Sequence, residues 1–125
     1  MSQIDLNSLE KALNSLENIL KQDINEFIRD GVIQRFEYTF ELSWKTLKRV
    51  LKEEGLDEES PKQVLRAAQR AGLIEGIDDW FSLLKYRNLT VHTYNDKTAE
   101  EVYENAKKFP QYVRNLITVL KNRVK

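Results

Sequence analysis

Apolar residues recur three and four positions apart along most of the chain, which is the spacing that gathers them on one face of an α-helix. The first such run starts near Asp5, where either Asp5 or Asn7 is available as the helix cap. Its apolar positions are Leu6, Leu9, Leu13, Leu16, Leu20 and Ile24. The pattern predicts a first helix of about five turns that faces the core.

A second and longer helix is predicted from Asn25 to Gly55, with Gly31 as a possible irregularity inside it. Its apolar stripe consists of Phe36, Phe40, Ser43, Trp44, Leu47 and Leu51. We expect these aromatic side chains in the core. Glu37 and Glu41 lie on a neighbouring polar line of this helix, and Lys45 follows Glu41 at the favourable acid-first spacing of four.

Capping signals divide the rest of the chain. Ser60-Pro61 followed by Gln63 predicts a capping box and a short helix that stops at Gly72. The next helix opens near Gly76 and places Trp80 in the core.

The last predicted helix starts with a second capping box at Thr98–Glu101 and continues to Val124. Pro110 should kink it near Phe109. The sum is an all-α antiparallel bundle of four main helices plus one short helix, in a single domain over residues 1–125.

Composition narrows the function. Twenty basic residues balance 20 acidic ones, so no global positive field recruits nucleic acid or an anionic membrane. Any RNA contact must come from a local patch. With no cysteine and a single histidine, we expect neither a metal site nor a cofactor. The start of the chain lacks the features of a signal peptide and no segment resembles a membrane span, so we expect a cytoplasmic protein.

The only histidine, His92, lies in the stretch YRNLTVHTY, residues 86–94. Histidine is the side chain best suited to proton transfer near neutral pH. Lys85, Asn88 and His92 share one helical face with Phe81, whereas Arg87 and His92 would lie roughly 140 degrees apart around an unbroken helix. Two arrangements would unite them. Either the helix ends or distorts within residues 89–91, or a two-fold dimer brings together the residues of two chains.

Such a set of residues suits metal-independent cleavage of RNA. A neutral histidine accepts the 2′-hydroxyl proton, a protonated second histidine donates to the leaving 5′-oxygen, and an arginine stabilises the charge that develops on the phosphate. The spacing alone leaves a plainer interpretation open. In that interpretation Arg87 pairs with an acidic residue of another helix, and His92 is merely a residue at a helix end.

The motif Arg87-Asn88-Leu89-Thr90-Val91-His92-Thr93-Tyr94 resembles the signature of HEPN domains. The wider pattern is similar to the HEPN branch called nucleotidyltransferase substrate-binding proteins. Residues 36–48 resemble the second helix of that branch, and Ser60-Pro61 with residues 67–73 resembles its third. The similarity extends from about residue 13 to residue 109.

The resemblance implies a helical homodimer whose partner is a small nucleotidyltransferase. In related toxin and antitoxin pairs the HEPN protein is a ribonuclease, and the nucleotidyltransferase neutralises it by attaching AMP to the motif tyrosine. Carried over by position, Arg87 and His92 are catalytic, Asn88 is a supporting polar residue and Tyr94 is the modified residue.

A second function is consistent with the same resemblance. The protein would then be a non-catalytic subunit that holds a nucleotide substrate for the nucleotidyltransferase. Lys85, Arg87 and Asn88 would bind a phosphate or a base, and His92 would contact the ligand. A third possibility is a plain helical adaptor with no chemistry of its own.

Overall fold

The computed structural model describes residues 4–123, and every regular element in that range is helical. The elements are α1 (Asn7–Leu20), α2 (Glu26–Glu53), α3 (Pro61–Arg70), α4 (Ile77–Asn88), the 3₁₀ helix η1 (Leu89–His92), α5 (Asp96–Ala106) and α6 (Phe109–Arg123). The predicted all-α bundle is therefore confirmed.

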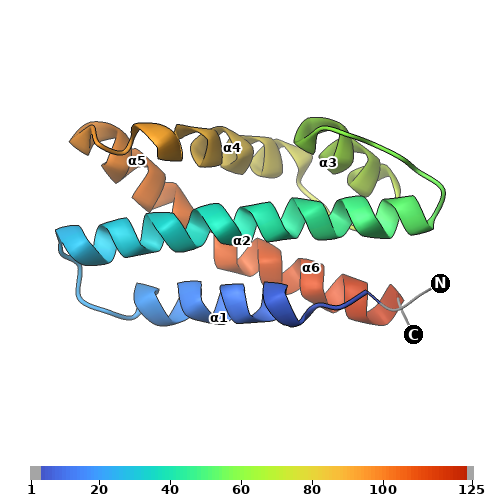
Figure 1. Cartoon of the computed structure of the whole chain (residues 1–125), viewed down its shortest axis with the longest axis horizontal. Helices are drawn as coiled ribbons and strands as arrows, with labels where there is room; N and C mark the ends of the chain where they lie inside the picture. Colours follow the sequence, from blue (N-terminus) through green and yellow to red (C-terminus); the bar gives the residue numbers. More distant parts are fainter. Residues whose placement is uncertain (1–3, 124–125) are drawn as a thin grey trace.

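The long helix α2 lies at the centre of the bundle (Figure 1). It contacts α1, α3, α4 and α5 along its length. α1 and α6 pack together on one side of α2, α3 and α4 lie on the other, and α5 connects the two sides (Figure 1). Because α2 contacts so many elements, its side chains can reach residues that are far apart in the sequence.

α2 and α3 begin close to their predicted positions. The Asn25 side chain caps α2 by accepting a hydrogen bond from the Ile28 amide. Ser60 and Gln63 form the predicted capping box of α3. Gly31 causes no irregularity, because α2 runs through it without a break.

The first helix is shorter than its apolar pattern predicted. α1 ends at Leu20, and Ile24 lies beyond it with 56% of its surface exposed, so Ile24 does not belong to the core face. The Asp5 carboxylate accepts a hydrogen bond from the Asn7 amide, although Leu6 occupies the N-cap position without a side-chain bond. Asp5 therefore satisfies an amide at the start of α1, although it lies one residue before the N-cap position.

The last predicted helix is two helices, α5 and α6. Pro110 lacks an amide hydrogen and its ring clashes with the carbonyl four residues earlier, which is where α5 ends, at Ala106. The predicted kink is in the right place but is a complete break. The capping box at Thr98 was wrong, because Asn95 caps α5 and accepts from the Thr98 amide. Val124 lies outside the described residues.

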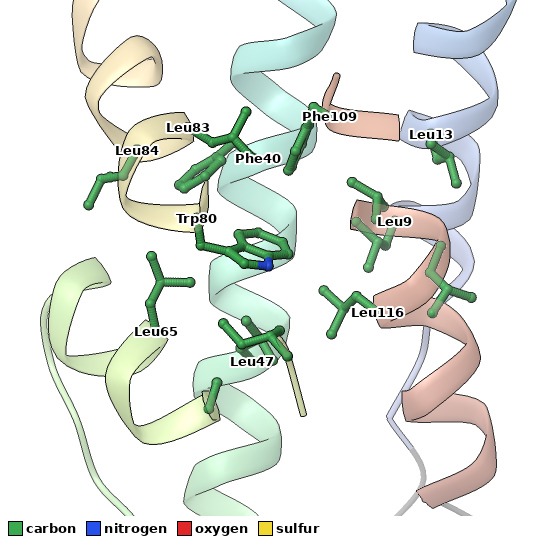
Figure 2. Close-up of a cluster of buried hydrophobic side chains, with 14 of the residues drawn as sticks. Leu9, Leu13, Phe40, Leu47, Leu65, Trp80, Leu83, Leu84, Phe109 and Leu116 are labelled. Atoms are coloured by element: carbon green, nitrogen blue, oxygen red, sulfur yellow. The ribbon is translucent and has the colours of Figure 1, made fainter. Parts of the chain in front are cut away.

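An aromatic cluster occupies the centre of the core (Figure 2). The Phe109 ring lies 5.4 Å from Phe36, 5.6 Å from Phe40 and 5.7 Å from Trp80, measured between centroids. All four rings are buried, as predicted for Phe36, Phe40 and Trp80. Trp44 differs from its prediction, because it is only half-buried and its indole N–H reaches Glu41 at 3.3 Å. One end of α6 is thus fixed against α2 and α4.

We expect Phe109→Ala to lower the free energy of unfolding by about 3–5 kcal/mol, because it leaves a cavity where three rings converge. Urea denaturation followed by circular dichroism would measure the change. Phe27→Ala is the matched control, since this phenylalanine is 83% exposed and its loss should change stability by less than about 1 kcal/mol. Similar losses for the two variants would contradict this account of the core.

The other end of α6 is held by an ion pair. The Arg123 guanidinium donates to both carboxylate oxygens of Glu54, just after α2, at 2.6 and 2.7 Å. These hydrogen bonds lower the pKa of Glu54 below its usual value. Arg123 also donates to the Ala71 carbonyl at 3.3 Å, so this one side chain links the ends of α6, α2 and α3.

Replacing Glu54 with Gln should cost up to about 1 kcal/mol at neutral pH, since the pair is bidentate but partly exposed. A lowered pKa in the folded state stabilises the protein above the ordinary pKa of about 4.3, and that stabilisation is lost as the pH falls through the lowered value. The difference between wild type and Glu54→Gln should therefore shrink below about pH 4. Asp57→Asn, which changes an exposed acid, is the control.

Candidate functional site

The motif lies where α4 changes into η1. α4 ends at Asn88, and residues 89–92 continue as a tighter 3₁₀ turn. Thr90 Oγ1 lies 2.7 Å from the Arg87 carbonyl and 2.6 Å from a Glu37 carboxylate oxygen, so its single proton can be shared between them. The distortion predicted within residues 89–91 is confirmed. At this distortion the hydroxyl of Thr90, a β-branched residue, contacts the Arg87 carbonyl.

Two carboxylates of α2 hold the motif in place. Glu37 contacts Thr90, and Glu41, one turn later, forms an ion pair with Arg87. Glu41 also pairs with Lys45 at 3.5 Å, as the spacing predicted. The polar line along α2 is therefore the surface to which the motif is bound.

Arg87 is consequently a restrained side chain. Only 25% of it is exposed, and besides Glu41 it donates to the Asn88 side-chain oxygen at 2.9 Å. A guanidinium has five N–H donors, and these two contacts leave some of them free to bind an anion. The arrangement also corresponds to the plainer interpretation of Arg87 as an ion-pair partner of another helix.

His92 lies at a shallow depression of about 460 Å³ between α3 and α4. The lining residues are Lys62, Phe81, Leu84, Lys85, Asn88, Leu89 and His92. The predicted face of Phe81, Lys85, Asn88 and His92 is thus confirmed as the floor and wall of one concave surface. It combines two cations, an amide and an imidazole, groups that suit a phosphate.

The His92 and Tyr94 side chains lie next to each other. The Tyr94 hydroxyl is 3.4 Å from His92 Nδ1, and the two rings meet edge to face with centroids 5.9 Å apart. Tyr94 is 83% exposed, and Val91 nearby is also exposed. The hydroxyl is therefore open to solvent while lying within a few ångströms of the imidazole.

The structure brings some of the predicted site residues together and separates others. Lys85, Asn88 and His92 share the depression, and Tyr94 lies beside His92. Arg87 turns to Glu41, and within residues 4–123 no hydrogen bond joins it to His92. The change to a 3₁₀ turn thus does not by itself bring Arg87 and His92 into contact.

Lys62 is a site residue that the sequence did not indicate. It belongs to α3, 30 positions before His92, and reaches the depression only because α3 packs on α4. The acidic partners of the motif, Glu37 and Glu41, were visible as a polar line but had no assigned role. Their role depends on which helix lies opposite.

Across residues 4–123, no three His, Asp or Glu side chains are grouped so as to hold a metal ion. In the same range no helix is both long and apolar enough to cross a membrane.

Comparison with known proteins gives consistent results. Residues 4–122 match the family model described as nucleotidyltransferase substrate binding protein like. A Haemophilus influenzae protein named Probable ribonuclease HepT is 36% identical, over 81% of each chain. A Thermus thermophilus crystal structure superposes with a TM-score of 0.84 at 37% identity, covering 90% of this chain and 98% of that one.

A second solved structure, also from Haemophilus influenzae, has a TM-score of 0.84 at 31% identity and covers 94% of this chain and 99% of its own. It is described as revealing the fold of a substrate-binding domain of a nucleotidyltransferase. The resemblance to the HEPN branch is confirmed, since the family model, the named relative and the superposed fold agree. The chain belongs to the family of nucleotidyltransferase substrate-binding proteins.

Proposed function

We propose that this protein is the ribonuclease toxin of a two-component module whose second component is a small nucleotidyltransferase. The observation that carries the proposal is the grouping of His92, Asn88 and two lysines around one open depression. The relative named as a ribonuclease supports it. The protein would act in the cytoplasm, where its RNA substrate is.

His92 would act as the general base. In the tautomer whose Nδ1 carries the proton and donates to the Tyr94 oxygen, Nε2 is unprotonated and can accept the ribose 2′-hydroxyl proton. The 2′-oxygen then forms a bond to phosphorus while the bond to the 5′-oxygen breaks, and a protonated histidine supplies the proton to that oxygen. The products are a 2′,3′-cyclic phosphate and a 5′-hydroxyl. Arg87 would stabilise the charge on the phosphate oxygens.

A single chain supplies one histidine, so the second would come from another copy. In a two-fold homodimer, His92 of each protomer would face the other across a shared cleft. The exposed Val91 next to His92 supports this arrangement, because a second copy would cover the apolar side chain that one chain leaves open. Arg87, held by Glu41 on one protomer, would then approach the imidazole of the other.

The partner would silence the enzyme through Tyr94. Transfer of AMP from ATP to the Tyr94 hydroxyl forms a phosphodiester and releases pyrophosphate. Because this oxygen is 3.4 Å from His92 Nδ1, the new group would place its bulk and negative charge at the imidazole. The exposure of Tyr94 supports access by a modifying enzyme.

A second candidate is a non-catalytic subunit that binds a nucleotide for the nucleotidyltransferase. The ion pair of Arg87 with Glu41 favours it, because a guanidinium held in place by a carboxylate can bind a phosphate through its remaining N–H donors without taking part in catalysis. The description of the related Haemophilus structure as a substrate-binding domain supports it too. Lys62, Lys85 and Asn88 would hold the phosphates in this case.

We expect the purified protein, without its partner, to cut single-stranded RNA in the presence of EDTA. His92→Ala should lower the rate by roughly 10²–10⁴-fold, since it removes the proton acceptor. Gel analysis of a labelled oligonucleotide would measure the rate, and circular dichroism would verify that the variant folds. Lys11→Ala on the opposite side of the bundle is the control and should cut like the wild type.

Intact RNA with the wild-type protein would favour the nucleotide-binding subunit. If neither RNA cleavage nor any partner-dependent reaction changed in His92→Ala, the protein would be an adaptor. The mass of the active species in solution tests the shared cleft separately. A strict monomer that cuts RNA would contradict it.

Co-expression with the proposed partner nucleotidyltransferase should raise the mass of the protein by whole AMP units, because Tyr94 offers an open hydroxyl. Intact-protein mass spectrometry would detect the increase. Tyr94→Phe should abolish it, whereas Tyr38→Phe, which changes another exposed tyrosine, should retain it. An unmodified wild type under conditions where the nucleotidyltransferase is active would argue against this mode of regulation.

A further inference from the structure

Helix α3 carries a row of cations on its exposed side. Lys62, Arg66 and Arg70 follow one another at intervals of four residues, so they lie on one face with a rise of about 6 Å between neighbours. The helix contains no acidic residue. Although the chain is neutral overall, this surface is strongly positive.

These cations are not engaged in the ion pairs that the described residues form. Within residues 4–123, no ion pair joins Lys62, Arg66, Arg70 or Lys85 to a carboxylate. By contrast, Arg29 and Arg123 each hold a carboxylate of another element. The positive charge of α3 is therefore not used to join helices.

Two of the cations converge on one aromatic ring. The Lys62 ammonium lies 5.7 Å and the Arg66 guanidinium 5.3 Å from the centroid of Phe81 on α4. The ring attracts each of them, but the two positive groups repel one another. In an isolated helix, like charges four residues apart cost about 0.2–0.5 kcal/mol a pair through this repulsion. A bound anion would relieve this cost.

The row leads to the depression that holds His92. Lys62, at the start of α3, lines this depression together with Lys85 and Phe81. Arg66 and Arg70 extend from Lys62 along α3, away from it. The cations therefore form a continuous surface of α3 and α4 that ends at the imidazole.

We propose that Lys62, Arg66 and Arg70 bind the backbone of single-stranded RNA, and that the strand runs along α3 into the depression at His92. The choice of RNA as the anion rests on the ribonuclease function proposed above. One cation per phosphate fits a straight ridge whose charges are about 6 Å apart. The strand would thus be held over about three phosphates on one side of the bond that is cut.

The test compares two sets of three substitutions, both made in His92→Ala protein so that RNA stays intact. One set is Lys62→Gln, Arg66→Gln and Arg70→Gln, and the control set is Lys11→Gln, Lys21→Gln and Lys108→Gln. Both remove three exposed positive charges from helical or near-helical positions. Fluorescence anisotropy would measure binding of a labelled ten-nucleotide RNA and of a labelled dinucleotide at several salt concentrations, and circular dichroism would verify folding.

We expect the α3 set to reduce the salt dependence of ten-nucleotide binding by about 2 units of log Kd per log salt, as three lost phosphate contacts require. Between about 50 and 200 mM salt, the protein with α3 intact should then lose about 20-fold more affinity than the α3 set. The control set should keep the original slope. Dinucleotide binding should lose no more than the one contact with Lys62, which lines the depression, because a dinucleotide is too short to reach Arg66 and Arg70.

An equal salt dependence of RNA binding in the α3 set and the control set would overturn the proposal. RNA cleavage by the protein with His92 intact would show that the ribonuclease function is unaffected by this result. RNA binding that depends on α3, in a protein that does not cut, would support the RNA path and refute the ribonuclease. An α3 set that binds RNA normally but no longer co-purifies with the nucleotidyltransferase would overturn the proposal by assigning the surface to that protein.

Discussion

The packing of Phe109 against Phe36, Phe40 and Trp80 is the contact on which the rest of the bundle depends. It joins the start of α6 to the middle of α2 and to the first turn of α4, three segments far apart in the sequence. Burial of aromatic surface dominates the energy of such a core, and the tilted and edge-to-face arrangements of the rings restrict how the helices can rotate. Since α4 continues from Trp80 directly into the motif, this cluster also sets where the motif lies.

Polar contacts then fix the motif on the far end of α4. Two carboxylates one turn apart on α2 hold Thr90 and Arg87, while the opposite side of the motif faces the depression with His92. One side of the motif is therefore bound to α2, and the other side is open to a ligand. The restraint on Arg87 suits either a structural ion pair or a guanidinium that is fixed before it meets a phosphate, because a held side chain loses less entropy on binding.

The balance of charge over the whole chain conceals a segregated distribution. Glu54 and Glu100 take part in ion pairs between elements, whereas Lys62, Arg66 and Arg70 of α3 form no ion pair within residues 4–123. A neutral protein of this kind would attract nucleic acid only over a short range, because salt screens a local patch within about 10 Å. The exposed Val91 and Tyr94 add an apolar border next to His92, where the proposed second protomer and the modifying enzyme would both need access.

The sequence determined what local forces control. Helical periodicity specified the all-α class, the capping box at Ser60 specified one helix start, and the motif together with the wider pattern of residues 13–109 indicated the family. The sequence-based prediction made α1 too long and replaced the full break before Phe109 with a kink. Periodicity does not show where a helix stops packing against its neighbours, or whether a proline kinks a helix or ends it. Only the tertiary structure decided that Arg87 turns to Glu41, and that Lys62 joins His92 across 30 positions. These contacts depend on which helices pack together, and long-range packing leaves no periodic signal in the chain.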